Sequence, residues 1–135
     1  MSGNNAKVVL HINGVLATFS VGSNEPSGNW TRFNTNGDAH HVGNGSGGTQ
    51  GDIYLAEFIF LDGQYEDYTS FGSFKNGVWT PDDPSGLDFS GNNSFHLKFE
   101  DASDLGNDSS SNNNDFTSSG LGADHQVLDS PTFGS

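Results

Sequence analysis

The sequence has no cysteine, and only four of its 135 residues are lysine or arginine. Without cysteine there are no disulfides and no thiolate chemistry. Nucleic acid is not expected as a partner, because neutralising its phosphates requires clustered basic side chains. No apolar run approaches the roughly 20 residues of a membrane-spanning helix, so no membrane insertion is predicted. The first residues also lack a basic segment followed by an apolar one, so no signal peptide is predicted.

Acidic and turn-forming residues are abundant instead. The formal net charge is −13, and the chain contains 19 Gly, 18 Ser and 15 Asn. Gly, Ser and Asn favour turns over helix interiors. The chain also has 11 Phe, 3 Tyr and 2 Trp, which argues against disorder because disordered chains are poor in aromatics. The length allows one domain with a modest core. The composition therefore predicts a single β-rich domain with large loops.

The clearest local pattern is KVVLHINGVLATFSV at residues 7–21. Two β-rich runs flank Asn13-Gly14, a dipeptide that supplies the positive φ angles of a tight hairpin turn. We therefore predict a β-hairpin here. Weaker patterns predict short strands at residues 30–34 and 40–43.

Two further strands are predicted later in the chain. DIYLAEFIFLD, residues 52–62, has apolar residues on both faces, which is typical of a central strand that is covered on both sides. SFHLKFE, residues 94–100, alternates instead, with Phe95, Leu97 and Phe99 on one face. This alternation predicts a half-buried strand.

Six motifs follow one another along nearly the whole chain: LHINGVL, IYLAEFIFLDG, FGSFKNGVWTPDD, NNSFHLKFED, LGNDSSSNNNDF and DHQVLDSPT. In this order they resemble the C-terminal half of the concanavalin A-like (LamG-like) domains of phage tail fibres and related virion proteins. The sequence departs from that pattern at Ser111, where the family usually has Gly. The resemblance implies an all-β, jelly-roll sandwich. Residues 1–100 would form the sandwich portion, and residues 101–135 a loop-rich C-terminal extension packed on the same domain.

Domains of this family normally carry further strands before the hairpin that ends in Asn-Gly. A sandwich needs two sheets that cover one another, and half of one would expose apolar faces and open strand edges. The resemblance therefore implies either a part of a longer fibre protein or a fold that a neighbouring subunit completes.

The stretch EDASDLGNDSSSNNNDF, residues 100–116, contains five acids and no base. Its spacing excludes an EF-hand, because Gly106 and Ser109 stand where a ligand and a glycine are required and no helix is predicted on either side. Three interpretations stay open, and a disordered stretch is one of them. The stretch could be an Asx-rich turn, in which Asp and Asn side chains satisfy backbone N–H groups. It could also be an irregular calcium site, with the candidate ligands Asp101, Asp104, Asp108 and Asp115.

Four aromatic side chains in polar loops are candidates for carbohydrate binding. Such side chains stack on sugar rings while short polar groups bond the hydroxyls, but they also pin loops to sheets. Pinning is the favoured role for Trp79. The pair His40-His41 is not predicted to chelate a metal, because adjacent residues on a strand point to opposite faces. The candidate carbohydrate-binding residues are Trp30, Tyr65, Tyr68 and Trp79.

No catalytic pattern is present. Glu57 has no acidic residue two or four positions further on, as a glycosidase couple on one strand would need, and neither a nucleophile triad nor a phosphate loop is found. We therefore expect a non-catalytic structural or adhesion module of a phage virion, a tail fibre or appendage, that reaches the extracellular space after lysis and binds a glycan or host receptor. The alternative is a pure assembly protein, which forms a homo-oligomer or fibre with copies of itself or other virion proteins and binds no sugar.

Overall fold

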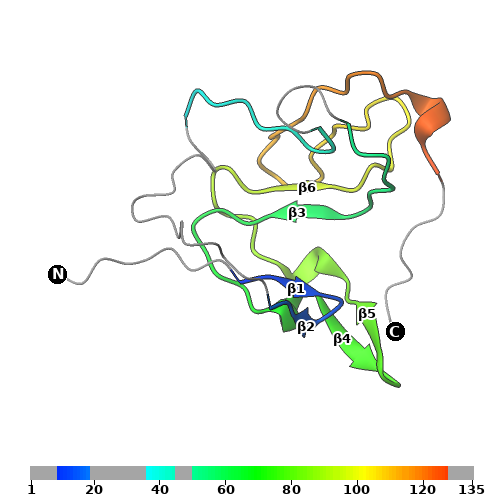
Figure 1. Cartoon of the computed structure of the whole chain (residues 1–135). Coiled ribbons are helices and arrows are strands. Elements are labelled where there is room, and N and C mark those ends of the chain that lie inside the picture. The colour runs from blue at the N-terminus through cyan, green and yellow to red at the C-terminus, as the bar shows by residue number, and fades with distance from the viewer. Residues whose placement is uncertain (1–8, 19–35, 45–49, 128–135) are drawn as a thin grey trace, which may run out of the picture. The chain divides into compact units, whose positions relative to one another are not determined.

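The computed structural model describes residues 9–18, 36–44 and 50–127. The chain divides into two compact units, Met1–Gly51 and Asp52–Ser135. Among the described residues the regular elements are six short strands and three single-turn 3₁₀ helices (Figure 1). The prediction of a β-rich fold is confirmed to this extent. Within the same residues, no helix has the length and apolar character that crossing a membrane requires.

The first unit contains the predicted hairpin. Strands β1 (His11–Ile12) and β2 (Val15–Leu16) pair antiparallel, with His11 opposite Leu16. The turn residues Asn13 and Gly14 have φ angles of 50° and 74°, the left-handed conformation that an Asn-Gly turn is suited to adopt. The hairpin prediction is therefore confirmed.

The two weaker strand predictions in this unit have different outcomes. Residues 30–34 lie outside the described part of the chain. Residues 40–43 contain no strand, and residues 42–43 form a bend, so that prediction is wrong. The pairing described nearby is an isolated bridge between Asn44 and Gln50. A bend is consistent with Gly43, which has a φ angle of 78° and interrupts extended backbone.

The second unit contains two antiparallel strand pairs. Strand β3 (Phe58–Phe60) pairs with β6 (Phe95–Leu97), and the two lie side by side in Figure 1. The ring of Phe95 lies 5.9 Å from the ring of Phe58 and 5.5 Å from that of Phe60, both stacked. Phe116 meets Phe95 edge-on at 4.9 Å. Cross-strand aromatic pairs of this kind stabilise two-stranded pairing.

The other pair is a hairpin formed by β4 (Gly72–Lys75) and β5 (Val78–Pro81). Its turn residues, Asn76 and Gly77, have φ angles of 52° and 80°. Short 3₁₀ helices precede and follow the hairpin, η1 (Tyr68–Ser70) and η2 (Pro84–Gly86), and η3 (Ala123–His125) lies near the end of the described chain. The hairpin turn repeats the Asn-Gly chemistry of the first unit.

The predicted central strand at residues 52–62 is wrong over most of its length. Only β3 is strand, and the residues before it, Ile53, Tyr54 and Leu55, are 59%, 88% and 40% exposed. Glu57 has a φ angle of 54°, a left-handed conformation that interrupts the extended backbone immediately before β3. In the described structure, the strand pairing with β3 is β6 alone, and the exposure of Ile53, Tyr54 and Leu55 shows that the preceding segment is not covered on either face.

The predicted alternation of β6 is also wrong. His96 and Leu97 are 6% and 1% exposed, so adjacent residues that point to opposite faces are both buried. The reason is that the acidic stretch 100–116 folds back over the strand. Asp108 forms a bridge with Leu97, and Ser109 N–H donates to the carbonyl of His96 at 2.8 Å.

Candidate functional site

The acidic stretch is organised around Asp108, which is only 4% exposed. Its Oδ1 accepts hydrogen bonds from the backbone N–H groups of His96 at 2.8 Å and Ser110 at 2.9 Å. Its Oδ2 accepts from Asn114 N–H at 2.9 Å and from the Ser110 hydroxyl at 2.8 Å. Burial by itself raises the pKa of Asp108, but the N–H groups of His96, Ser110 and Asn114 outweigh it and hold the pKa below its usual value.

The other candidate calcium ligands are also engaged with nearby donors. Asp101 Oδ1 accepts from the backbone and hydroxyl of Ser103, and Asp104 Oδ1 accepts from Gly106 N–H. Asp115 Oδ1 accepts from the N–H of Asp108 itself. The Asx-turn interpretation is thus confirmed. Among the described residues, no three acidic, His or Cys side chains are grouped so as to hold a metal ion, and calcium binding stays a prediction.

Two asparagines of the same stretch join it to the loop before β6. Asn112 Nδ2 donates to the carbonyls of Phe89, Gly91 and Ser94, at 2.7 to 3.0 Å. Asn114 Nδ2 donates to the carbonyls of Asn92 and Ser94, both at 2.9 Å. These side chains satisfy backbone acceptors that no strand pairs, and they hold the loop against the acidic stretch. The composition of the Ser and Asn run at residues 109–114 gives no signal for this role.

The aromatic candidates are only partly brought together. The ring of Trp79 lies 5.8 Å from that of Tyr68 and 5.3 Å from that of Phe74. These contacts are what the favoured pinning role of Trp79 requires. Tyr65 is 80% exposed in the loop that leads to η1. Trp30 lies outside the described residues.

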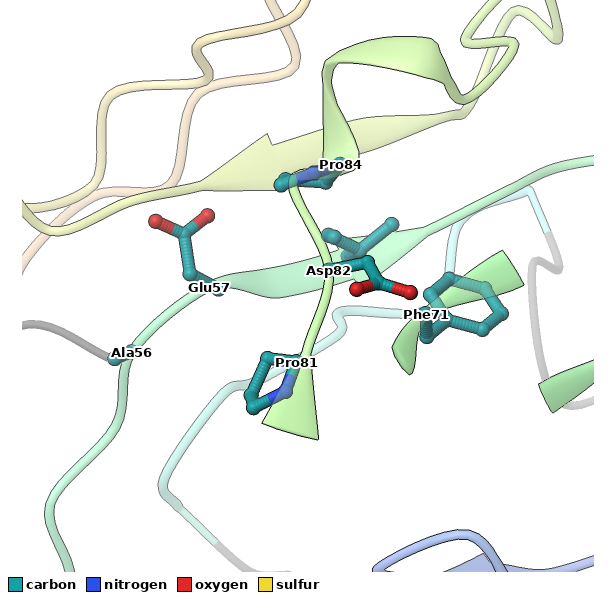
Figure 2. Close-up of a pocket in the computed structure, with 7 residues that line it drawn as sticks. Ala56, Glu57, Phe71, Pro81, Asp82 and Pro84 are labelled. Carbon is teal, nitrogen blue, oxygen red and sulfur yellow. The ribbon is translucent and has the colours of Figure 1, made fainter. Parts of the chain in front are cut away.

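A cavity of about 190 Å³ lies beside β3 in the second unit. In the view of Figure 2, the segment from Pro81 to Pro84 runs between Glu57 and Phe71. Ala56 and Ile59 complete the lining, which is apolar apart from the carboxylates of Glu57 and Asp82.

Glu57, which lines this cavity, is paired with a buried histidine. His96 Nε2 on β6 hydrogen-bonds to Glu57 Oε2, and the His96 ring stacks on Phe89 at 5.6 Å. Sequence reasoning missed this pair because it looked for an acidic partner of Glu57 on the same strand. The two residues are 39 positions apart and are adjacent only because β3 pairs with β6.

In comparisons with known proteins, no family model, curated protein or solved structure matches the chain. The resemblance of its motifs to phage virion domains therefore supports a proposed function and does not establish a family.

Proposed function

We propose that the chain is a non-catalytic structural module of a phage virion appendage, and that it associates with further copies of itself through exposed apolar residues in and just before β3. The jelly-roll sandwich is part of this proposal, with a neighbouring copy supplying strands that cover the sheet. The virion setting rests on the ordered motif series between residues 7 and 132. The association rests on the burial pattern of the second unit.

The observation that carries the proposal is the exposure of residues 53–58. Proline aside, the buried hydrophobic side chains of the described residues are Leu97 and Leu105. By contrast, four large apolar side chains lie exposed in and just before β3, namely Ile53, Tyr54, Leu55 and Phe58. A contiguous apolar segment beside a strand that has one described partner is a typical site for the addition of a strand from another chain.

The net charge sets the conditions for this association. Each copy carries a formal charge of −13, so two copies repel one another at low ionic strength. Salt shortens the Debye length from about 30 Å at about 0.01 M to about 3 Å at about 1 M. Burial of apolar surface is not weakened by this screening. Self-association is therefore expected to strengthen as salt is added.

Sedimentation velocity at about 0.01 M and about 1 M sodium chloride tests the proposal. We expect the average mass to at least double at high salt, and the double variant Ile53→Ser/Leu55→Ser to remain monomeric there. The matched control is Leu121→Ser, which alters another exposed leucine, 58% accessible, and should associate like the wild type. A monomer at every salt and protein concentration would contradict the proposal.

Glycan binding is a second candidate, favoured by the 80% exposure of Tyr65 in a polar loop. A free aromatic face of this kind can stack on a sugar ring, and repetition of a weak site in an oligomer raises the overall avidity. A glycan array probed with and without calcium is expected to show binding that falls at least tenfold in Tyr65→Ala. Val78→Ala, also at an exposed position (67%), should bind normally. Absence of sugar binding in both conditions would remove this candidate.

A further inference from the structure

The cavity beside β3 has walls suited to an aliphatic chain. Ile59 on β3, the ring of Phe71 and the rings of Pro81 and Pro84 line it. Its volume is about 190 Å³, well above the roughly 10–15 Å³ that a single water molecule needs. It is therefore much larger than a bare metal ion needs, and its lining is mostly apolar, as ligand sites usually are.

The polar groups of this cavity are both carboxylates. Asp82 accepts one long hydrogen bond, from the Ser73 hydroxyl at 3.4 Å, which is close to the limit for such a bond. Glu57 is shared with His96. Within the described part of the chain, neither carboxylate forms an ion pair with Lys or Arg. A negative charge beside apolar walls interacts more strongly with an incoming cation than one in open water does.

The apolar walls and the negative charge of the cavity together determine which class of ligand fits. An anion is repelled by the carboxylates, and a neutral chain leaves the charge of Asp82 unmatched. A cation on an aliphatic stem satisfies both, because its stem packs on the prolines and Ile59 while its charge meets Asp82. The ring of Phe71 adds a cation–π attraction. We propose that this cavity binds an alkylammonium group, and specifically the lysine side chain of another protein. This inference goes beyond the proposed self-association and does not depend on it.

Amide shift mapping by NMR tests the proposal on the whole chain at low salt, with Nα-acetyl-lysine-N-methylamide as the probe. We expect the amides of Ile59, Phe71 and Asp82 to shift. The matched norleucine derivative has the same stem without the ammonium group and should shift them at least fivefold less. This comparison uses only the wild-type protein. Equal shifts from the two probes, or no shift from the lysine probe, would overturn the proposal.

Two variants test whether the Asp82 carboxylate, rather than the overall charge of the protein, binds the ammonium group. Asp82→Asn keeps the shape of the side chain and is expected to weaken binding of the lysine probe at least fivefold. Asp124→Asn removes a carboxylate that is 85% exposed in η3 and should change binding less than twofold. Equal weakening by both variants would show that only the overall charge matters and would overturn the site. Binding of n-butylammonium as tight as that of the lysine probe would overturn the assignment to a protein side chain in favour of free amines.

Discussion

Replacing Asp108 with asparagine is expected to destabilise the fold of residues 52–127 by about 3 kcal/mol, the range for breaking a buried, hydrogen-bonded charge. The carboxylate is 4% exposed and accepts four hydrogen bonds. An amide has one oxygen, so its NH₂ group would replace an acceptor oxygen and leave at least one backbone N–H donor unsatisfied. Urea denaturation followed by tryptophan fluorescence measures the loss. Asp124→Asn, at an exposed carboxylate, is the control and should lie within about 0.5 kcal/mol of the wild type.

The destabilisation caused by Asp108→Asn is expected to depend on pH. The pKa of Asp108 is lower in the folded state than its ordinary value of 3.8. A carboxyl with a lowered folded pKa contributes stability that is present above the unfolded pKa and is lost as the pH falls through the folded pKa. The difference in unfolding free energy between wild type and Asp108→Asn should therefore be constant at neutral pH and shrink below about pH 4. A difference that stays constant down to about pH 2 would show that the Asp108 charge is not what stabilises the fold.

Replacing Gly106 with alanine is expected to cost roughly 3 kcal/mol or more, or to prevent folding, at the upper end of what an overpacked site costs. A Cβ atom at this buried position would lie 1.6 Å from the carbonyl oxygen of Phe116 and 2.6 Å from its carbon. Neither atom can move aside easily, because both belong to backbone and Phe116 N–H donates to the Gly106 carbonyl at 2.8 Å. The close approach joins the two ends of the turn that surrounds Asp108.

Gly86→Ala is the matched control for this second prediction. A Cβ atom at Gly86 would have no neighbour within 4 Å, so the change should lie within about 0.5 kcal/mol of the wild type. Urea midpoints of both variants, measured under the same conditions, provide the comparison. If Gly106→Ala is as stable as Gly86→Ala, the contact between residues 106 and 116 does not exist in solution.

Local chemistry made part of this fold predictable. Asn13-Gly14 predicted the first hairpin correctly, because the turn itself requires positive φ angles. The same dipeptide at Asn76-Gly77 forms the second hairpin and could have been identified in the same way. The pattern at 52–62 was misleading, because apolar residues on both faces indicate a covered strand only if other elements are present to cover it.

The sites depended on contacts that are distant in sequence. The spacing of acids around residues 100–116 led to Asx turns as one interpretation, and the structure contains them. The special position of Asp108 could not be inferred, because its burial arises when the stretch folds over β6. Similarly, His96 lies opposite Ile59 in the β3–β6 register, and this pairing is what brings it to Glu57. No spacing rule along one strand contains that information.

The hydrogen-bonded stretch over β6 also has a thermal consequence. Exposing apolar surface on unfolding raises the heat capacity, whereas exposing polar surface lowers it. Residues 52–127 bury few large apolar side chains, whereas the Asp108 carboxylate is buried and several backbone carbonyls accept hydrogen bonds from part-buried asparagine side chains. Their heat-capacity increment should therefore fall below the usual value of roughly 12–15 cal/mol/K per residue. The curve of unfolding free energy against temperature is then broad and flat for this unit. The unit loses little stability on cooling, because hydrophobic burial, which weakens in the cold, contributes little to it.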